Sequence, residues 1–152
     1  IGGGLNVAAC CDVSICSKKS HFAIPAAKLS LGYPFSSIKR LFDIMGPGIS
    51  KHFMFTAERI LADEALSCGL VQKLVEDGNI EEFVNNYAEK IAGNAPLTIK
   101  AMKNIGIEIL KNPSDRNLKE CKNLAEACFD SNDYIEGRRA FMEKRKPNFK
   151  GN

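Results

Sequence analysis

The sequence lacks any apolar run that approaches the roughly 20 residues needed for a transmembrane helix, so we predict a soluble protein with no membrane partner. It also lacks a strong charge of either sign, because 21 Lys and Arg residues face 18 Asp and Glu residues for a net charge of +3. This mild excess suits a phosphate-bearing ligand and falls short of the basic stripe of a nucleic-acid-binding protein. An ordinary solvated surface explains the same charge.

Metal ligands at the usual spacing and paired cysteines are also lacking. The two histidines, His21 and His52, have no partners at metal-ligand spacing, and we expect both to be surface or packing residues. No CxxC pair occurs, and the cysteines stand among apolar neighbours, which predicts reduced core residues. The six are Cys10, Cys11, Cys16, Cys68, Cys121 and Cys128.

The residue pattern changes near residue 36 from glycine-punctuated apolar runs to helical spacing. Alternation with period two predicts a strand, and apolar residues three or four apart predict amphipathic helices. Glycine and proline mark the helix ends. The pattern predicts a strand at 13–16, an extended piece at 70–75, and helices at 38–45, 49–54, 62–68, 80–91, from 96 onward, at 118–128 and from 133 onward.

Two features are predicted near the C-terminal end of the sequence. Asp133 and Glu136 have the spacing of a capping box, which predicts that the last helix starts there. A basic segment, Lys144-Arg145-Lys146, follows that helix. Cations at a helix C-terminus complement the helix dipole, so a solvated helix end accounts for this segment without a ligand.

The run Gly2-Gly3-Gly4 stands before an apolar stretch at the start of the chain. Without side chains the backbone can approach a ligand closely, and unpaired N–H groups at a helix start point toward negative charge. Three glycines more often form a turn than a binding site. The residues alone therefore leave both interpretations open.

Five segments, in this order and spacing, resemble the crotonase, or enoyl-CoA hydratase/isomerase, superfamily. The resemblance runs from the central glycine run of that family to its C-terminus and covers essentially the whole chain. The segments are GGGLNVAACCD (2–12), FAIPAAKLSLGY (22–33), FTAERILADEALSCGLV (55–71), NAPLTIKAMK (94–103) and DSNDYIEGRRAFMEKRKPNFKGN (130–152).

The resemblance implies an α/β fold in which residues 1–75 are the C-terminal portion of the ββα spiral core. Residues 76–152 would then be an α-helical trimerisation region, with assembly as a trimer or a dimer of trimers. Because the chain begins at Ile1 directly on the glycine run, the resemblance also implies that the N-terminal part of the fold is missing. A location in the bacterial cytoplasm or the mitochondrial matrix is implied as well.

The resemblance makes the backbone N–H of Gly3 the second donor of an oxyanion hole, a contribution of about 3 to 4 kcal/mol to transition-state stabilisation. Hydratases of the family have two catalytic glutamates where this sequence has Asn6 and Ala26. Neither residue transfers a proton, and positioned acid-base groups typically contribute roughly 10²- to 10⁴-fold. Asn6 could orient a water or satisfy the local backbone.

Tyr33 stands where methylmalonyl-CoA decarboxylase-like members of the family carry a tyrosine that faces the acyl group. A phenol is neutral at pH 7 and can donate a hydrogen bond to a carboxylate or a proton to an enolate. Decarboxylation fits this set of residues because it needs enolate stabilisation and a proton donor, but no general base. The alternative is a rim aromatic in the turn between Gly32 and Pro34.

Phe141 and Lys144 match the positions from which the family contacts the CoA nucleotide, commonly across a subunit boundary. A lysine beside a phosphate is physically reasonable. Spacing alone favours a core position for Phe141 and a solvated helix end for Lys144. Coenzyme A would enter as part of the thioester substrate, with no permanently bound cofactor.

The leading hypothesis is a crotonase-family acyl-CoA enzyme that stabilises a thioester enolate and is decarboxylase-like. The alternatives are an enoyl-CoA hydratase or isomerase that uses acids from the N-terminal part, and a noncatalytic acyl-CoA-binding subunit. In either enzymatic case the chain alone would be inactive. A basic nucleic-acid module rests only on the C-terminal Lys and Arg residues and would require steeply salt-dependent binding.

Overall fold

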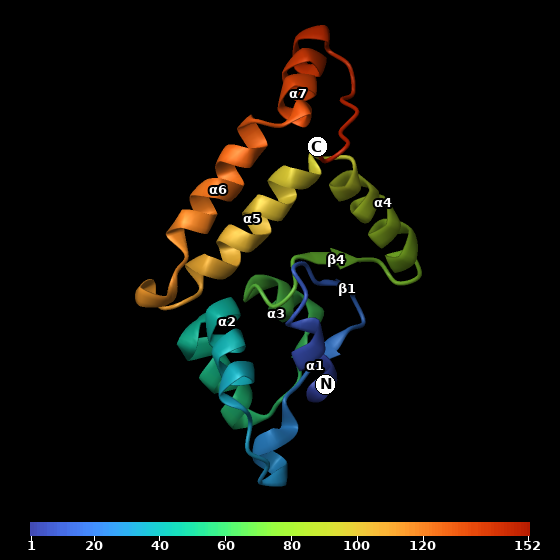
Figure 1. The fold of residues 1–152 in the computed structure, drawn as a ribbon. Coiled ribbons are helices and arrows are strands. Elements are labelled where there is room, and N and C mark those ends of the chain that lie inside the picture. Colours follow the sequence, from blue (N-terminus) through green and yellow to red (C-terminus); the bar gives the residue numbers. More distant parts are fainter. The chain divides into compact units, whose positions relative to one another are not determined.

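The computed structural model describes residues 1–152 and is mostly helical, with four short strands (Figure 1). By contacts it divides into two compact units, unit 1 (Ile1–Asn85) and unit 2 (Asn86–Asn152). The predicted boundary after residue 75 precedes this division. No helix combines the length and the apolar character that crossing a membrane requires. The elements are α1 (Gly3–Ala8), β1 (Ile15–Ser17), β2 (His21–Phe22), the 3-10 helix η1 (Pro25–Leu29), α2 (Phe35–Thr56), β3 (Ile60–Leu61), α3 (Ala62–Ser67), β4 (Lys73–Val75), α4 (Ile80–Ala92), α5 (Pro96–Ile109), the 3-10 helix η2 (Pro113–Asp115), α6 (Leu118–Phe129) and α7 (Asn132–Glu143).

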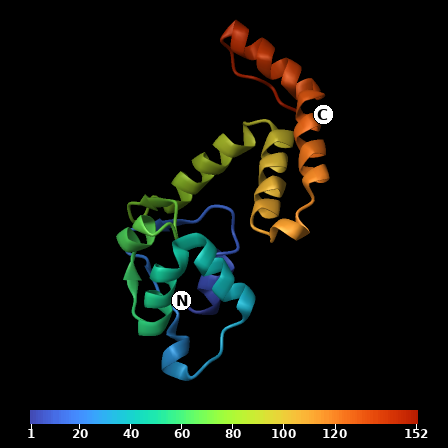
Figure 2. The ribbon, with the colours of Figure 1, turned by 90° about the vertical axis from the view of Figure 1, so that its left-hand side faces the viewer.

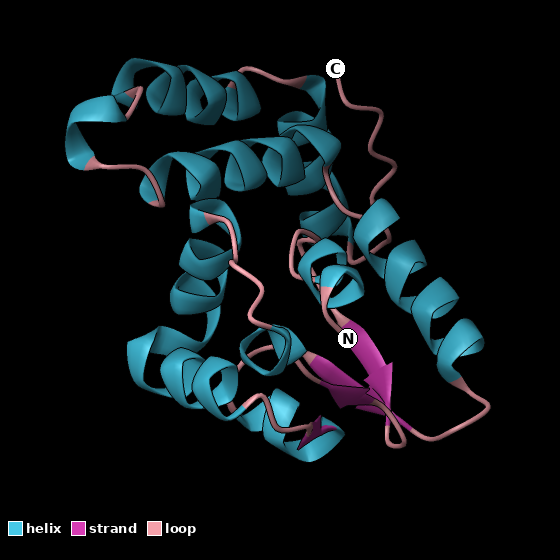
Figure 3. Cartoon of the chain, turned by 90° about the horizontal axis from the view of Figure 1, so that it is seen from below, coloured by secondary structure: helices cyan, strands magenta, loops and turns pink.

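All four strands belong to unit 1 and are only two or three residues long (magenta in Figure 3). β1 pairs with β4 in parallel, with Ile15 opposite Lys73, and β2 pairs with β3 antiparallel. Parallel neighbours need a long crossover connection, and the chain between β1 and β4 supplies one that contains α2 and α3. The strand predicted at 13–16 is confirmed, with its start shifted to Ile15.

One apolar cluster forms the core of unit 1 and joins α1, η1 and α2. Leu5 of α1, Ala26 of η1 and Phe53 of α2 are all buried in it. Tyr33 is half-buried and packs against the same cluster. The glycine-run helix and the loop that carries Tyr33 are therefore anchored on shared apolar contacts.

α2 is broken in its middle, where the sequence predicted two separate helices. Gly46 has φ 76° and ψ 164°, a conformation that is essentially restricted to glycine, and Pro47 follows it. The fully buried Ser50 donates its hydroxyl to the carbonyl of Leu41 at 2.9 Å across this break. The apolar stripes at 38–45 and 49–54 are thus two helical segments joined at a fixed bend.

In unit 2, α5 and α6 lie side by side, as both Figure 1 and Figure 2 show. The predicted helices from 96 and at 118–128 are confirmed. The predicted capping box at Asp133 and Glu136 is wrong. Ser131 is the N-cap of α7, and its hydroxyl accepts the N–H of Tyr134 at 3.1 Å. Asp133 and Glu136 instead bind the C-terminal tail.

All six cysteines are free thiols, but they do not share one environment. Cys16 is buried, and burial raises the pKa of its thiol. Cys10 and Cys11 are exposed at the end of α1, so the prediction of core positions is wrong for these two. Cys10 and Cys11 have apolar neighbours in the sequence, but they follow the end of α1 and their side chains do not reach the core.

Replacing Gly46 with alanine tests the bend in α2. Gly46→Ala should lower the free energy of unfolding by about 1 to 3 kcal/mol, because a Cβ disfavours its backbone conformation while meeting no atom within 4 Å. Gly48→Ala is the matched control: it also meets no atom, has no positive φ, and should raise stability by up to about 1 kcal/mol. Urea unfolding measures both, and equal stabilities would contradict the bend.

Candidate functional site

The glycine run forms the start of α1, and its residues Gly3 and Gly4 are exposed. Gly2 has φ 55°, and its N–H donates to the carbonyl of Ala23 at 2.8 Å. Gly3 and Gly4 are the first two helical residues, whose N–H groups have no partner inside a helix. A Cβ at Gly3 or Gly4 would meet no atom within 4 Å. Both amides can therefore be reached by a ligand.

The other residues predicted to decide the chemistry lie around the same core. Asn6 is half-buried on α1, three residues after Gly3, and its side chain makes no hydrogen bond within the described chain. Ala26 is buried on η1, and Tyr33 packs on the cluster that contains both Ala26 and Leu5. Ala26 and Tyr33 thus share an apolar cluster with Leu5, which follows the glycine run in α1.

Two neighbouring hollows, of about 450 and 230 Å³, lie between α1 and β1. Leu5, Ala8, Ile15 and Phe22 line both of them, and Gly4 lines the larger one. Their walls are mostly apolar. Neither hollow includes Asn6 or Tyr33, so they do not join the predicted catalytic residues in one pocket.

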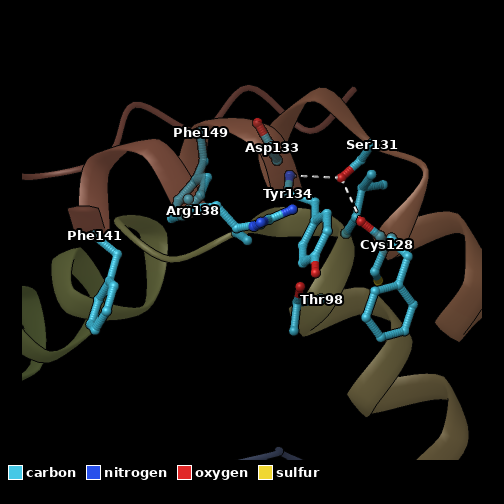
Figure 4. Close-up of a pocket in the computed structure, with 12 residues that line it drawn as sticks. Thr98, Cys128, Ser131, Asp133, Tyr134, Arg138, Phe141 and Phe149 are labelled. Atoms are coloured by element: carbon cyan, nitrogen blue, oxygen red, sulfur yellow. Dashed lines mark hydrogen bonds between the residues drawn. The ribbon is translucent and has the colours of Figure 1, made fainter. Parts of the chain in front are cut away.

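Unit 2 contains a separate cavity of about 490 Å³ (Figure 4). The rings of Phe129 and Tyr134 meet edge to face at 5.4 Å, and the guanidinium of Arg138 lies 5.7 Å from the centre of the Tyr134 ring. Phe149 of the tail and Phe141 of α7 complete the aromatic lining. The cavity is suited to a flat or apolar group with negative charge nearby.

A serine at the α6–α7 junction builds this aromatic corner. The Ser131 hydroxyl donates to the carbonyl of Cys128 at 2.7 Å and accepts the N–H of Tyr134, so one side chain connects the end of α6 to the start of α7 (dashed lines in Figure 4). Phe129 and Tyr134 flank this junction and are thereby brought into ring contact.

Phe141 is 83% exposed although it lines the cavity, so the spacing-based expectation of a core position is wrong. Its helical neighbours Tyr134 and Gly137 also line the cavity, and a shared helix face here borders a hollow rather than a packed core. Of the aromatic lining, the sequence identified only Phe141.

Lys144 ends α7 in a left-handed conformation with φ 54°, and its N–H donates to the carbonyl of Phe141 at 3.3 Å. Its side chain is exposed and forms no ion pair. Arg145 differs, since it makes two parallel hydrogen bonds to Glu136 at 2.6 and 2.9 Å and a third to Glu143 at 2.5 Å. This guanidinium holds the pKa of Glu136 at about 2. Arg145 is therefore structural, and Lys144 is available to a ligand.

The predicted site residues separate by unit. Gly3, Asn6 and Tyr33 belong to unit 1, and Phe141 and Lys144 belong to unit 2. The described residues contain no group of three or more His, Cys, Asp or Glu side chains arranged to hold a metal ion.

Comparison with known proteins gives one consistent family. The model of the enoyl-CoA hydratase/isomerase family matches residues 1–152. The crotonyl-CoA hydratase of Syntrophomonas wolfei is 34% identical over 149 residues, which are 98% of this chain and 57% of the relative. The short-chain-enoyl-CoA hydratase of Clostridium acetobutylicum is 35% identical over 96% of this chain and 56% of its own length.

A solved structure has the same fold. The enoyl-CoA hydratase of Bacillus anthracis superposes with a TM-score of 0.90 at 32% identity, over 99% of this chain and 58% of that one. The chain therefore spans a little over half the length of these relatives. The comparisons do not establish the predicted placement as the C-terminal part of the family's proteins, nor a trimerisation role for the helices.

Gly2 and Gly3 differ in backbone conformation, so alanine substitutions at the two positions should differ in their effect on stability. Gly2→Ala should lower the free energy of unfolding by about 1 to 3 kcal/mol, because its φ of 55° with ψ −124° is strained for any residue with a Cβ. Gly3→Ala should leave stability unchanged or slightly higher, since its Cβ meets nothing. Thermal unfolding of both variants decides this, and comparable losses would refute the assigned backbone.

Proposed function

This chain belongs to the enoyl-CoA hydratase/isomerase, or crotonase, family, and on that premise we propose that it contributes to an enzyme that stabilises the enolate of an acyl-CoA thioester, with decarboxylation preferred to hydration. The proposal rests on Asn6 and Ala26, which stand where the resemblance expects the acids of a hydratase, on the open space at Gly3, and on Tyr33, which packs on the same core. Because the chain spans a little over half the length of its relatives, we propose that residues outside 1–152 form the rest of the catalytic pocket.

Gly3 is proposed as a hydrogen-bond donor to the thioester oxygen. Its N–H is free of helical partners, and the space beside it is open, so a carbonyl oxygen can approach the backbone. When the enolate forms, negative charge develops on that oxygen, and the hydrogen bond strengthens. A donor of this kind contributes about 3 to 4 kcal/mol to transition-state stabilisation.

Tyr33 is proposed as the proton donor. In the decarboxylation of a malonyl-type thioester, the bond between Cα and the carboxylate breaks, CO₂ leaves, and the electron pair moves onto the thioester oxygen. The phenol of Tyr33 then donates its proton to Cα and is reprotonated from solvent. No base is needed, which fits the amide of Asn6 and the methyl of Ala26 at the acid positions.

The second candidate is hydration or isomerisation of an enoyl-CoA, and it is favoured by the names of the relatives, which include a crotonyl-CoA hydratase and a short-chain-enoyl-CoA hydratase. In that case the acids come from chain beyond residues 1–152. A noncatalytic acyl-CoA-binding subunit would bind the same thioesters without turnover.

Phe141 and Lys144 are proposed to contact the nucleotide portion of coenzyme A. The cavity beside Phe141 is aromatic, and Lys144, three residues later, is the exposed C-cap residue of α7. Such a cation suits a phosphate. In the trimer or dimer of trimers that we propose, these residues would serve a neighbouring subunit's substrate.

Assays of the intact protein with a malonyl-type and an enoyl-CoA thioester test the reaction. We expect decarboxylation of the first and slow hydration of the second. Tyr33→Phe should lower kcat for decarboxylation by roughly 10²- to 10⁴-fold while the ring stays packed on the core. Efficient hydration without decarboxylation, unaffected by Tyr33→Phe, would establish the second candidate, and tight binding without turnover would establish the noncatalytic one.

Lys144→Asn tests the nucleotide contact without disturbing the helix end. Asparagine tolerates the left-handed conformation of residue 144, so only the charge is lost. Affinity for free coenzyme A, measured by calorimetry, should fall roughly tenfold to a hundredfold, as expected for a charge-assisted hydrogen bond. Lys146→Asn on the same segment is the control. Equal affinities for wild type and Lys144→Asn would remove Lys144 from the site.

A further inference from the structure

The last residues of unit 2 form a strap, defined here as residues 145–152, that runs back along α7 (red in Figures 1 and 2). The strap has no helix or strand of its own. Its backbone N–H groups therefore need acceptors from elsewhere, and α7 provides them through two carboxylates.

Asp133 is the first of these carboxylates and is only 4% exposed. Its Oδ1 accepts the N–H of Lys150 at 2.7 Å, and its Oδ2 accepts the N–H of Gly151 at 2.7 Å. Gly151 has φ 78°, which brings the two consecutive N–H groups onto one carboxylate. Both oxygens of a buried charge are thus occupied by the strap.

Glu136 is the second carboxylate and lies three residues later, on the same face of α7. It accepts the N–H of Asn148 at 2.9 Å in addition to the paired hydrogen bonds from Arg145. In return, the carbonyl of Asn152 accepts the N–H of Asn132 at 2.8 Å at the start of α7. The strap and the helix end therefore satisfy each other's backbone groups.

Phe149 lies between the strap residues that these carboxylates hold. Its ring packs against Gly137, where a Cβ would come within 3.4 Å of the ring, and it forms part of the wall of the unit 2 cavity. Figure 4 shows Phe149 beside Arg138 on that wall. Because hydrogen bonds fix the backbone at Asn148 and Lys150, the position of this ring depends on Asp133 and Glu136.

We propose that Asp133 and Glu136 are positioning residues for coenzyme A binding: by binding the backbone of the strap, they hold Phe149 in the cavity wall. This inference rests on the proposed function. Asp133 borders the cavity, but both of its oxygens accept N–H groups of the strap, and Glu136 does not line the cavity. Each acts through the backbone of the strap, so its loss should weaken binding and leave the chemical step unchanged.

The test uses Asp133→Asn and Glu136→Gln in the intact protein. Each change removes one carboxylate oxygen that accepts an N–H of the strap. We expect KM for the thioester and the dissociation constant of coenzyme A to rise roughly tenfold or more, with kcat retained. Hydrogen exchange at Asn148, Lys150 and Gly151 should accelerate in the same variants.

Glu143→Gln is the matched control, because Glu143 pairs with the Arg145 side chain but accepts no backbone N–H of the strap. Its KM should change little, as for exposed ion pairs in general. Phe149→Ala is the second variant: it keeps both carboxylates and should reproduce the rise in KM. If Asp133→Asn does not fold, Phe149→Ala still tests whether the position of this ring affects KM.

Two results would overturn the inference. One is accelerated exchange in the strap with unchanged KM and coenzyme A affinity, and the other is unchanged KM in Phe149→Ala. If the wild-type protein binds no coenzyme A, the proposed function fails and this inference fails with it. If wild type binds and all variants bind equally, only this inference fails.

Discussion

A buried carboxylate that accepts two consecutive backbone N–H groups is the constraint on which unit 2 depends. Removing a charge from water is costly unless hydrogen bonds replace its hydration, and Asp133 obtains both of its bonds from the strap. The helix cannot keep this side chain buried unless the tail stays in place. The hydrogen bonds that stabilise the Asp133 carboxylate therefore also hold the strap, and with it Phe149, in the wall of the aromatic cavity.

In unit 1, apolar contacts rather than hydrogen bonds to a carboxylate hold the elements together. Leu5 is buried in the core while its neighbours Gly3 and Gly4 stay exposed, so one short helix is fixed from one side and open on the other. Tyr33 is held against the same cluster. Packing rather than polar contacts positions the groups that would face the thioester. This arrangement keeps backbone amides unpaired, which a polar network would not do.

The sequence predicted features whose cause is local and missed those whose cause is distant. The break at Gly46 was predictable because Gly-Pro interrupts a helix wherever it occurs. Asp133 and Glu136 were misread because capping-box spacing looks the same whether the carboxylate serves its own helix or a strap more than ten residues away. The exposure of Phe141 likewise depends on a hollow formed by separate elements. The glycine run was located correctly, and its role still rests on the family.

The contrast between Gly2 and Gly3 has a consequence for how such sequences diverge. Gly2 is held by its own backbone angles, a demand of folding that persists whatever the protein does. Gly3 has no positive φ, and no atom of residues 1–152 lies within 4 Å of where its Cβ would go, so these residues do not require a glycine there. If Gly3 serves the proposed oxyanion site, related chains without that chemistry should keep the first glycine and vary at the second. The identities of these two adjacent residues would then distinguish the demands of folding from those of the proposed ligand site.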